Sequence, residues 1–220
     1  MRRISKAKML KVNEIYFSIQ GESSKAGLPC VFVRLTYCNL RCSYCDTEYA
    51  FYDGKEMTLD KIIAEVTKYN CKLVEITGGE PLVQAESLEL MKRLCDNGFD
   101  VMLETGGSLP IEEIDKRVMI ILDLKCPSSK MMKKNLYENM DFIKPTDEIK
   151  FVIGTREDYE WTKEQITKYR LIDKCSLLMS VVFGSLEPLK LVEWILADNL
   201  KVRFQLQMHK FIWEPNAKGV

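Results

Sequence analysis

Three cysteines fall within eight positions of the chain, at Cys38, Cys42 and Cys45, in a C-x3-C-x2-C spacing. Cysteine thiolates are the usual ligands of iron–sulfur clusters, and a [4Fe–4S] cluster ordinarily takes four of them. Three clustered thiolates therefore leave one iron open to an outside ligand, and an open coordination site implies chemistry. The alternative is a structural zinc site, for which the only histidine, His209, would have to supply the fourth ligand.

The other five of the eight cysteines are scattered singly along the chain, which argues against a disulfide framework. Cys71, Cys95 and Cys175 lie beside helix or strand patterns. A free cysteine in such a place usually packs as a small apolar residue. Cys126 is less clear, because it belongs to one of the motifs described next.

Three further motifs each follow a strand-like run: TGGEP at residues 77–81, ETGG at 104–107 and DLKCPSS at 123–129. Paired glycines let the backbone approach a ligand closely. Glu104 and Lys125 stand at strand ends, where their charges could bind a ligand of opposite charge. Each could equally be a solvated strand-end residue.

The elements that must position these motifs alternate between strand and helix. Amphipathic helices are predicted at residues 58–69, 86–97, 156–169 and 186–198, and an extra strand at 11–20. The stretch 125–147 is polar, rich in lysine and weakly periodic, so we predict a loop or a degenerate crossover there. Strand-like runs fall at residues 31–37, 73–77, 100–104, 118–124, 149–153, 177–182 and 202–207.

Strands joined by helical crossovers form a parallel sheet, with ligands at the carboxyl ends of the strands. We predict an α/β fold in a single domain over residues 1–220. Its form is a partial, open TIM-like β/α barrel of six or seven parallel strands with an N-terminal extension. The cysteine loop, placed just after the first strong strand, would then lie at the catalytic end.

The amino-acid composition limits the kinds of partner that the protein can bind. Lysine plus arginine equals aspartate plus glutamate at 32 each, so there is no bulk charge to attract nucleic acid or an anionic membrane. No apolar stretch of signal-peptide or membrane-spanning length is present, and the basic start of the chain is not followed by one. We expect a cytoplasmic protein that contacts neither nucleic acid nor membrane directly.

The cysteine spacing and the three later motifs together resemble the radical S-adenosylmethionine superfamily. The resemblance implies that the amino and carboxylate groups of S-adenosylmethionine chelate the fourth iron, and that reduction of the cluster cleaves this cofactor to methionine and a 5′-deoxyadenosyl radical. It also implies a set of cofactor-binding residues, namely Gly79, Glu104, Lys125 and the backbone of Cys126, Pro127 and Ser128.

Flanking segments are similar to the 7-carboxy-7-deazaguanine synthase family: IYFSIQGE at residues 15–22, FVRL at 32–35, CDT at 45–47 and QMHK at 207–210. That family belongs to queuosine and archaeosine biosynthesis. The resemblance implies a carbon–nitrogen lyase that contracts the ring of 6-carboxy-5,6,7,8-tetrahydropterin with loss of ammonia. The implied substrate contacts come from the backbone of Ile19, Gln20 and Gly21 and from Gln20, Arg34, Thr77 and His209.

Arg34 suits bidentate binding of the substrate carboxylate, although an arginine on a strand could also form a structural ion pair. The resemblance further implies a Mg²⁺ ion that joins the Thr47 hydroxyl to that carboxylate; a simple capping role is the alternative for Thr47. The chain departs from the family pattern at Tyr37 and Ser23, where glycine is usual, and at Met208 inside the terminal QMHK segment. Tyr37 would be hard to place if its backbone needs a positive φ.

The resemblance implies a flavodoxin-like reductant. We also predict a homodimer, because an open barrel leaves sheet edges and a cleft mouth to cover and because similar proteins form homodimers. The closest rival is a glycyl-radical activating enzyme, which shares the cysteine loop but docks a large protein; Arg34 and the turn at Gln20 favour a small-molecule pocket instead. A rival of another class is a non-catalytic zinc or iron–sulfur protein. The sequence does not assign the residues that transfer protons.

Overall fold

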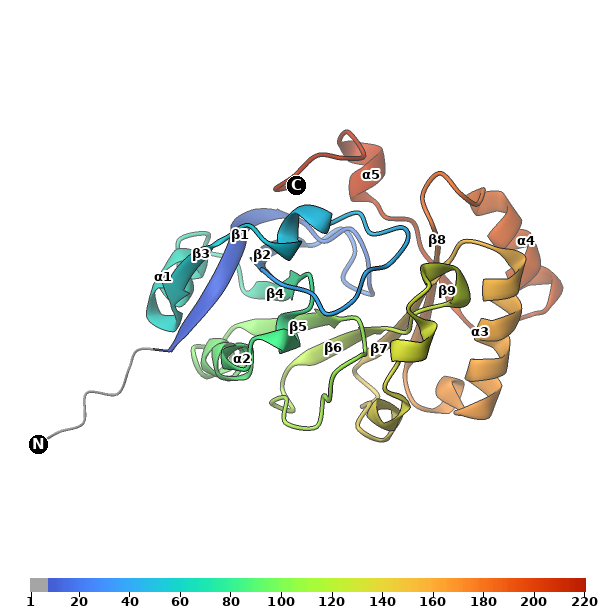
Figure 1. The fold of residues 1–220 in the computed structure, drawn as a ribbon, viewed down its shortest axis with the longest axis horizontal. Coiled ribbons are helices and arrows are strands. Elements are labelled where there is room, and N and C mark those ends of the chain that lie inside the picture. Colours follow the sequence, from blue (N-terminus) through green and yellow to red (C-terminus); the bar gives the residue numbers. More distant parts are fainter. Residues whose placement is uncertain (1–7) are drawn as a thin grey trace, which may run out of the picture.

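A computed structural model describes residues 8–220 and contains one nine-stranded sheet in the order β3-β1-β2-β4-β5-β6-β7-β8-β9 (Figure 1). Neighbouring strands from β2 to β9 pair in parallel, which makes seven parallel strands. The first and last strands of this order do not pair with each other, so the barrel is open as predicted. The parallel strands are β2 (Pro29–Leu35), β4 (Leu73–Gly78), β5 (Asp100–Thr105), β6 (Met119–Asp123), β7 (Glu148–Ile153), β8 (Ser176–Val181) and β9 (Arg203–Phe204).

The N-terminal extension adds two antiparallel strands to one edge of the sheet. β1 (Met9–Ile19) pairs with β2, and β3 (Lys55–Thr58) pairs with β1 on its other side. The sequence predicted β1 from its alternation of apolar and polar residues. It missed β3, which has four residues and no apolar alternation of its own.

Four helices of nine to thirteen residues cover the sheet: α1 (Leu59–Thr67), α2 (Glu86–Asp96), α3 (Arg156–Lys168) and α4 (Pro188–Ala197). The Thr58 hydroxyl accepts from the amide of Lys61 and so caps α1, while Gly98, with φ of 77°, ends the turn after α2. Each helix turns one face to the core, although the buried face of α3 includes the polar residues Asp158, Thr162 and Gln165. All four predicted helices are confirmed within a few residues. A short fifth helix, α5 (His209–Ile212), was not predicted.

The connection from β6 to β7 contains no α-helix. It runs through three short 3-10 turns, η3 (Pro127–Ser129), η4 (Met132–Lys134) and η5 (Tyr137–Asp141). Asparagine side chains hold it in place: Asn135 bonds both the amide and the carbonyl of Lys125, and Asn139 accepts from the amide of Ile111 in the connection between β5 and β6. The prediction of a degenerate crossover is confirmed.

One apolar cluster fills the space between the sheet and the helices and includes Val33, Ile76, Leu103, Ile62 and Leu191. Among the helices of residues 8–220, none combines the length and apolar character that crossing a bilayer requires. The basic segment 1–6 lies outside the described residues, so a single domain over 1–220 stays a prediction.

Candidate active site

A cavity of about 830 Å³ opens at the carboxyl ends of the parallel strands. Segments from residue 16 to residue 220 contribute to its wall, and the wall is rich in charged and polar side chains. Of the site residues predicted from the sequence, thirteen line it: Ile19, Gln20, Gly21, Arg34, Cys38, Cys42, Cys45, Thr47, Thr77, Gly79, Glu104, Lys125 and His209. The fold therefore brings most of the predicted site into one space.

The cysteine loop follows β2, and all three of its thiols are half-buried and free. The loop is held by its own backbone, because the amide of Cys45 donates to the carbonyl of Cys42 at 3.2 Å and the amide of Leu40 donates to the Cys38 sulfur at 3.4 Å. Burial raises the pKa of each thiol, that of Cys42 to about 11. Binding a metal would displace these protons.

The first glycine motif lies directly against the cysteine loop. The amide of Glu80 donates to the carbonyl of Tyr37 at 2.8 Å, and a Cβ on Gly79 would come within 2.2 Å of that same oxygen. Tyr37 itself has φ of 80°, so this chain places a bulky residue in the left-handed region that usually favours glycine. The positive φ that was expected to make Tyr37 hard to place is therefore present, and the loop accommodates the tyrosine in spite of it.

Glu80 ties the first glycine motif to the second. Its buried carboxylate accepts from the amide of Leu82 at 3.1 Å, the amide of Gly106 at 2.8 Å and the hydroxyl of Thr105 at 2.9 Å. Burial raises the pKa of Glu80, while these donors stabilise its charged form. One side chain thus sets the relative positions of the loops after β4 and β5.

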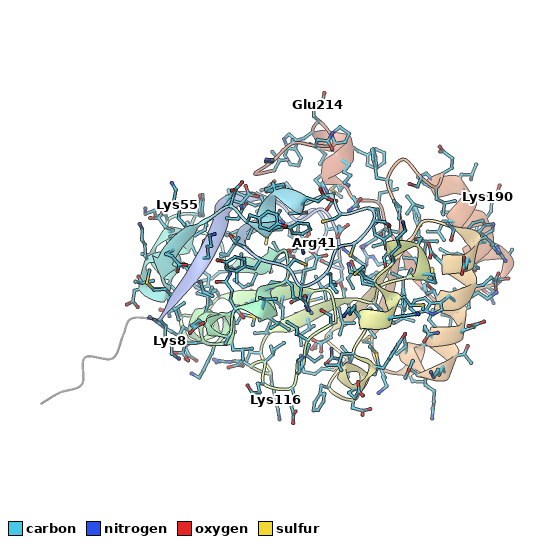
Figure 2. The ribbon with its side chains drawn as sticks, in the orientation of Figure 1. Lys8, Arg41, Lys55, Lys116, Lys190 and Glu214 are labelled. Carbon is cyan, nitrogen blue, oxygen red and sulfur yellow. The ribbon has the colours of Figure 1, made fainter. Side chains whose placement is uncertain are left out.

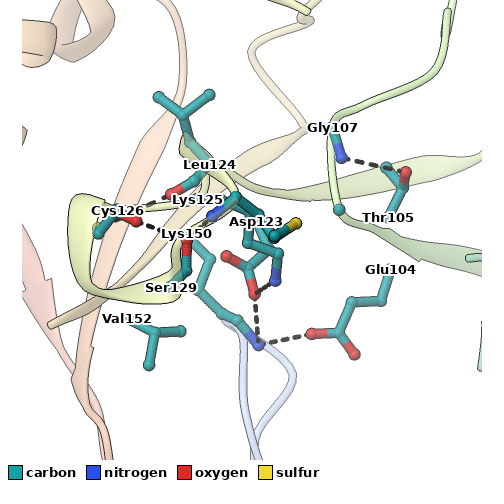
Figure 3. Close-up of polar contacts among 12 residues, drawn as sticks. Glu104, Thr105, Gly107, Asp123, Leu124, Lys125, Cys126, Ser129, Lys150 and Val152 are labelled. Carbon is teal, nitrogen blue, oxygen red and sulfur yellow. Dashed lines mark hydrogen bonds and ion pairs between the residues drawn. The ribbon is translucent and has the colours of Figure 1, made fainter. Parts of the chain in front are cut away.

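A buried lysine from β7 organises the charges of the cavity. Lys150 Nζ lies 2.5 Å from carboxylate oxygens of both Glu22 and Glu104 and 4.0 Å from Asp123, which in turn pairs with Lys125 at 2.8 Å. Figure 3 shows Lys150 between Asp123 and Glu104. Burial opposes the charged form, but the surrounding carboxylates outweigh it and raise the pKa of Lys150.

Two buried oxygens in this network have no hydrogen-bond donor among residues 8–220, Oε1 of Glu22 and Oδ1 of Asp123. Buried carboxylate oxygens are nearly always paired, so their isolation indicates a place for a ligand that carries amino or hydroxyl groups. Both residues line the cavity. The donor set therefore suits the hydrogen-bonding edge of a small polar molecule.

Arg34 is held on two sides before any ligand binds. Its Nε donates to Glu14 at 2.8 Å, and one terminal nitrogen donates to the Tyr16 hydroxyl at 2.8 Å. The guanidinium also lies 5.8 Å from the centre of the Tyr49 ring. The structural ion pair considered from the sequence is therefore present, and it fixes a guanidinium whose other terminal nitrogen stays free for a ligand among the described residues.

Gln20 is more constrained than its sequence suggests. Its amide nitrogen donates to the buried Glu75 carboxylate, its side-chain oxygen accepts from the amide of Glu22 at 3.0 Å, and its backbone pairs with Gly27 and Leu28. Burial, with Glu104 and Glu22 nearby, raises the pKa of Glu75. A role for Gln20 as a direct donor to substrate would compete with these bonds.

Gly21 and His209 meet at the cavity wall, although they are far apart in the chain. The amide of Met208 donates to the carbonyl of Gly21 at 2.9 Å, and a Cβ on Gly21 would lie 2.4 Å from Nδ1 of His209. Glycine is needed here because any side chain would displace the imidazole. Burial lowers the pKa of His209 below its ordinary value.

Thr47 begins the short turn η1 (Glu48–Phe51) but makes no side-chain capping bond. Its hydroxyl donates to Asp46 at 2.9 Å, and Asp46 pairs with Lys210 at 2.8 Å. The side chain of Asp46 is 49% exposed. Its partial desolvation works against its charge, yet Lys210 holds its pKa well below the usual range. The side chain of Thr47 therefore does not cap the turn. Its hydroxyl oxygen lies at the cavity wall, beside the carboxylate of Asp46.

Comparison with known proteins shows which family this chain resembles. The model of the radical SAM superfamily matches residues 32–187. A protein named 7-carboxy-7-deazaguanine synthase from Chlorobaculum tepidum is 47% identical over 214 residues, covering 96% of this chain and 97% of its own. A protein of the same name from Thermoplasma acidophilum is 36% identical over 204 residues, covering 92% and 96%.

The chain belongs to the 7-carboxy-7-deazaguanine synthase family of radical SAM proteins. A crystal structure of QueE from Escherichia coli has the same fold, with a TM-score of 0.75 at 21% identity over 91% of this chain and 95% of that one. The superfamily and family resemblances found from the sequence are confirmed.

Membership of the radical SAM superfamily implies a [4Fe–4S] cluster and S-adenosylmethionine, and the residues present fit them. Within residues 8–220 no three histidine, cysteine, aspartate or glutamate side chains converge closely enough to hold a single ion. Thiolates that bind separate irons of a cluster lie farther apart than the ligands of one ion, so three half-buried free thiols on one loop suit the cluster.

Three residues that the family resemblance assigned to the cofactor, Cys126, Pro127 and Ser128, do not line the cavity. Cys126 is fully buried in the apolar cluster. The amide of Ser128 donates to Asp158 at 2.8 Å, and its carbonyl accepts from the Ser43 hydroxyl at 2.6 Å. In this structure the segment supports the cysteine loop from behind, and cofactor contact by these residues stays a prediction.

Several cavity residues of this family member were missed from the sequence: Glu22, Asp46, Glu75, Lys150, Lys210 and residues 215–220. Lys150 offered a signal, because a central parallel strand is normally apolar on both faces and a lysine between Ile149 and Phe151 breaks that pattern. The tail 215–220 offered none, since nothing in its composition indicates where it packs.

Proposed function

We propose that this chain is a 7-carboxy-7-deazaguanine synthase, which converts 6-carboxy-5,6,7,8-tetrahydropterin to 7-carboxy-7-deazaguanine and ammonia in 7-deazapurine biosynthesis. The observation that carries this proposal is that the three cysteines open into the same cavity as Arg34, Glu22 and Lys150. A radical generated at the cysteine loop would therefore form beside groups that can hold a small polar substrate.

In this proposal Cys38, Cys42 and Cys45 hold the cluster, and Gly79, Glu104 and Lys125 contact S-adenosylmethionine. When bound, the two cofactors supply a radical that can abstract hydrogen from carbon. Glu104 is well suited to an ammonium or to ribose hydroxyls, because Lys150 on its other side lowers its pKa against the effect of burial and keeps it charged. Gly79 lets the ligand approach without a side chain between backbone and cofactor.

The pterin would lie between the turn at residues 19–21 and Arg34. The free terminal nitrogen of Arg34 can bind the substrate carboxylate, and Glu14 and Tyr16 keep the guanidinium in one orientation. The unpartnered oxygen of Glu22 suits the amino edge of a pterin. Thr77 and His209 complete the predicted substrate contacts, and both lie on the cavity wall.

We further propose that Mg²⁺ binds at Thr47. Its hydroxyl and the neighbouring Asp46 are oxygen ligands of the kind a hard cation prefers. Two protein oxygens make a weak site, so the substrate carboxylate and water would supply the rest, and affinity for the ion should be low without substrate. Removal of Mg²⁺ would then leave the substrate carboxylate less well oriented.

The remaining proposals concern the electron donor, the cellular location and the oligomeric state. A flavodoxin-like protein would supply electrons in the cytoplasm, where reducing conditions suit eight free cysteines. A homodimer is proposed from the sequence resemblance. The two sheet edges give it little support, because β9 and β3 are only two and four residues long and leave little backbone to pair.

The test is anaerobic reconstitution with iron and sulfide, followed by reductant, S-adenosylmethionine, Mg²⁺ and carboxytetrahydropterin. Mass spectrometry should find 7-carboxy-7-deazaguanine from the unaltered protein and none from Cys42→Ala. Formation of 5′-deoxyadenosine without the product would keep the superfamily and reject the substrate. Radical transfer onto an added glycyl-radical protein would support the rival activating enzyme, and absence of both small-molecule products would support a non-catalytic metalloprotein.

A further inference from the structure

The loop behind the cysteines carries an unusual concentration of positive charge for a chain with no net charge. Residues 126–137 contain three lysines and no acidic residue. Lys130, Lys133 and Lys134 are all exposed, and none lies within 4.0 Å of a carboxylate among the described residues. We call these three side chains the basic rim.

The basic rim is attached to the part of the protein that would hold the cluster. The amide of Ser43, which lies between Cys42 and Cys45, donates to the carbonyl of Ser129 at 3.1 Å, and its hydroxyl donates to the carbonyl of Ser128. Lys130 is the next residue after that contact. At the other end, Asn135 is bonded twice to the backbone of Lys125. The rim is therefore fixed beside the cysteine loop on the outer side of the cavity.

The surface next to the basic rim carries a further positive charge and two methionines. Arg41, on the cysteine loop itself, is exposed, and Figure 2 labels it near the centre of the view. Met131 and Met132 lie between the lysines and are only half-buried. Methionine is adaptable at contact surfaces, and exposed lysines steer an oppositely charged protein by long-range attraction.

We propose that the basic rim is the docking surface for a small acidic protein that delivers one electron to the cluster. The inference rests on the proposed function only in that a redox cluster sits at Cys38, Cys42 and Cys45. In the docked complex one electron would leave a reduced flavin on the partner and reduce the cluster, with no atom transferred. Electron-transfer encounters of this kind use small, charged and short-lived interfaces.

The experiment reverses the charge of the rim in the reconstituted holoenzyme, as Lys130→Glu, Lys133→Glu and Lys134→Glu together, and measures binding of a purified flavodoxin. The dissociation constant should rise about tenfold or more at low ionic strength, and flavodoxin-driven formation of 5′-deoxyadenosine should slow in parallel. The rate with dithionite, a small reductant that needs no docking site, should stay unchanged. That last measurement separates failure of docking from failure of the proposed function.

The matched control is a triple reversal at exposed lysines that also lack a carboxylate partner but lie away from the cysteine loop, Lys55→Glu, Lys61→Glu and Lys116→Glu. Figure 2 labels Lys55 and Lys116 at the periphery of the molecule. Equal weakening in both triple variants would overturn the proposal, as would unchanged flavodoxin binding in the rim variant. Loss of tRNA binding with flavodoxin binding intact would assign the rim to nucleic acid and also overturn it.

A milder set guards against misfolding of the reversal variant. Lys130→Gln, Lys133→Gln and Lys134→Gln together remove the charge without adding a new one, and should weaken flavodoxin binding by a smaller factor. In the unaltered protein, flavodoxin binding should weaken steeply between low and physiological ionic strength, and the glutamine variant should lose most of that dependence. A salt dependence equal to that of the unaltered protein would contradict the proposal.

Discussion

At the scale of single residues, two of the departures expected from the family resemblance share one physical property. Tyr37 has φ of 80° and Ser23 has φ of 64°, so both stand in the left-handed backbone region that favours glycine. Strain of this kind persists where the surrounding structure holds the loop, and at Tyr37 the bonds to Glu80 and Ala50 do so.

This gives a prediction about Tyr37 that inverts the usual preference for alanine over glycine. Both Tyr37→Gly and Tyr37→Ala remove the ring, so their difference reports the backbone alone. Tyr37→Gly should be more stable by about 0.5–1 kcal/mol, since relief of left-handed strain exceeds the entropy that glycine costs. The free energy of unfolding in urea, measured for both variants, gives this difference. At Tyr52, which is exposed with φ of −131°, alanine should be the more stable of the same pair.

A second residue-scale prediction concerns Glu75. Burial, together with Glu104 and Glu22, raises its pKa, so the native state keeps a proton that the unfolded chain releases above pH of about 4.3. Stability should therefore fall as pH rises through the pKa of Glu75 in the folded protein. Glu75→Gln keeps an acceptor for Gln20 and removes the titration.

The free energy of unfolding in urea, measured from pH 5 to pH 9, tests this. The advantage of Glu75→Gln over the unaltered protein should grow with pH. Glu112→Gln, at an exposed position, should differ from the unaltered protein by a small and constant amount. Parallel curves for Glu75→Gln and the unaltered protein would show that Glu75 does not hold the proton.

At the scale of elements, periodicity located the strands and helices that bury a regular face. It predicted the seven parallel strands and four helices because each lies in a strand or helix pattern of five or more residues, although β9 forms only over Arg203–Phe204 of the predicted run 202–207. It failed for β3 and α5, which have four residues each and owe their form to the neighbours on which they pack. The β6–β7 connection could be predicted only as irregular, since asparagine side chains supply its bonds.

The loops after β4 and β5 should depend on one carboxylate. The amides of Leu82 and Gly106 bond different oxygens of Glu80, and Glu80→Gln leaves only one acceptor oxygen, so one of these amides then faces an amide donor and the protein should be destabilised by about 2 kcal/mol. Hydrogen exchange should accelerate at whichever of Leu82 and Gly106 loses its acceptor. Glu112→Gln serves again as the control. Unchanged exchange at both amides would show that Glu80 does not join the two loops.

At the scale of the whole molecule, the cavity combines segments whose meeting the sequence could not reveal. The cysteines and the strand-end motifs were predictable, because parallel strands bring their carboxyl ends to one edge. Lys150 pairs with three carboxylates, those of Glu22, Glu104 and Asp123, only after β5, β6 and β7 are in register beside the turn at Glu22. The lysine is recognisable in the sequence because it interrupts an apolar strand, but its partners depend on packing between distant segments, for which a single sequence carries no signal.

The tail gives the last prediction. Residues 215–220 form part of the cavity wall, and Lys218 Nζ lies 4.3 Å from the centre of the Tyr49 ring, on the aromatic group that also contacts Arg34. Figure 1 shows this end of the chain on the same side as α5. Deleting residues 215–220 should open the substrate end of the cavity and raise KM for the pterin about tenfold.

Iron content after reconstitution should not change in this deletion, because the cysteine loop is held by residues 128–129 and not by the tail. Lys218→Gln should give a smaller rise of about two- to fivefold, since it removes one cation–π contact worth about 0.5–1 kcal/mol and leaves the wall in place. An unchanged KM in the deletion would mean that the substrate binds without the tail. A parallel loss of iron would instead mean that the tail supports the fold around the cysteines.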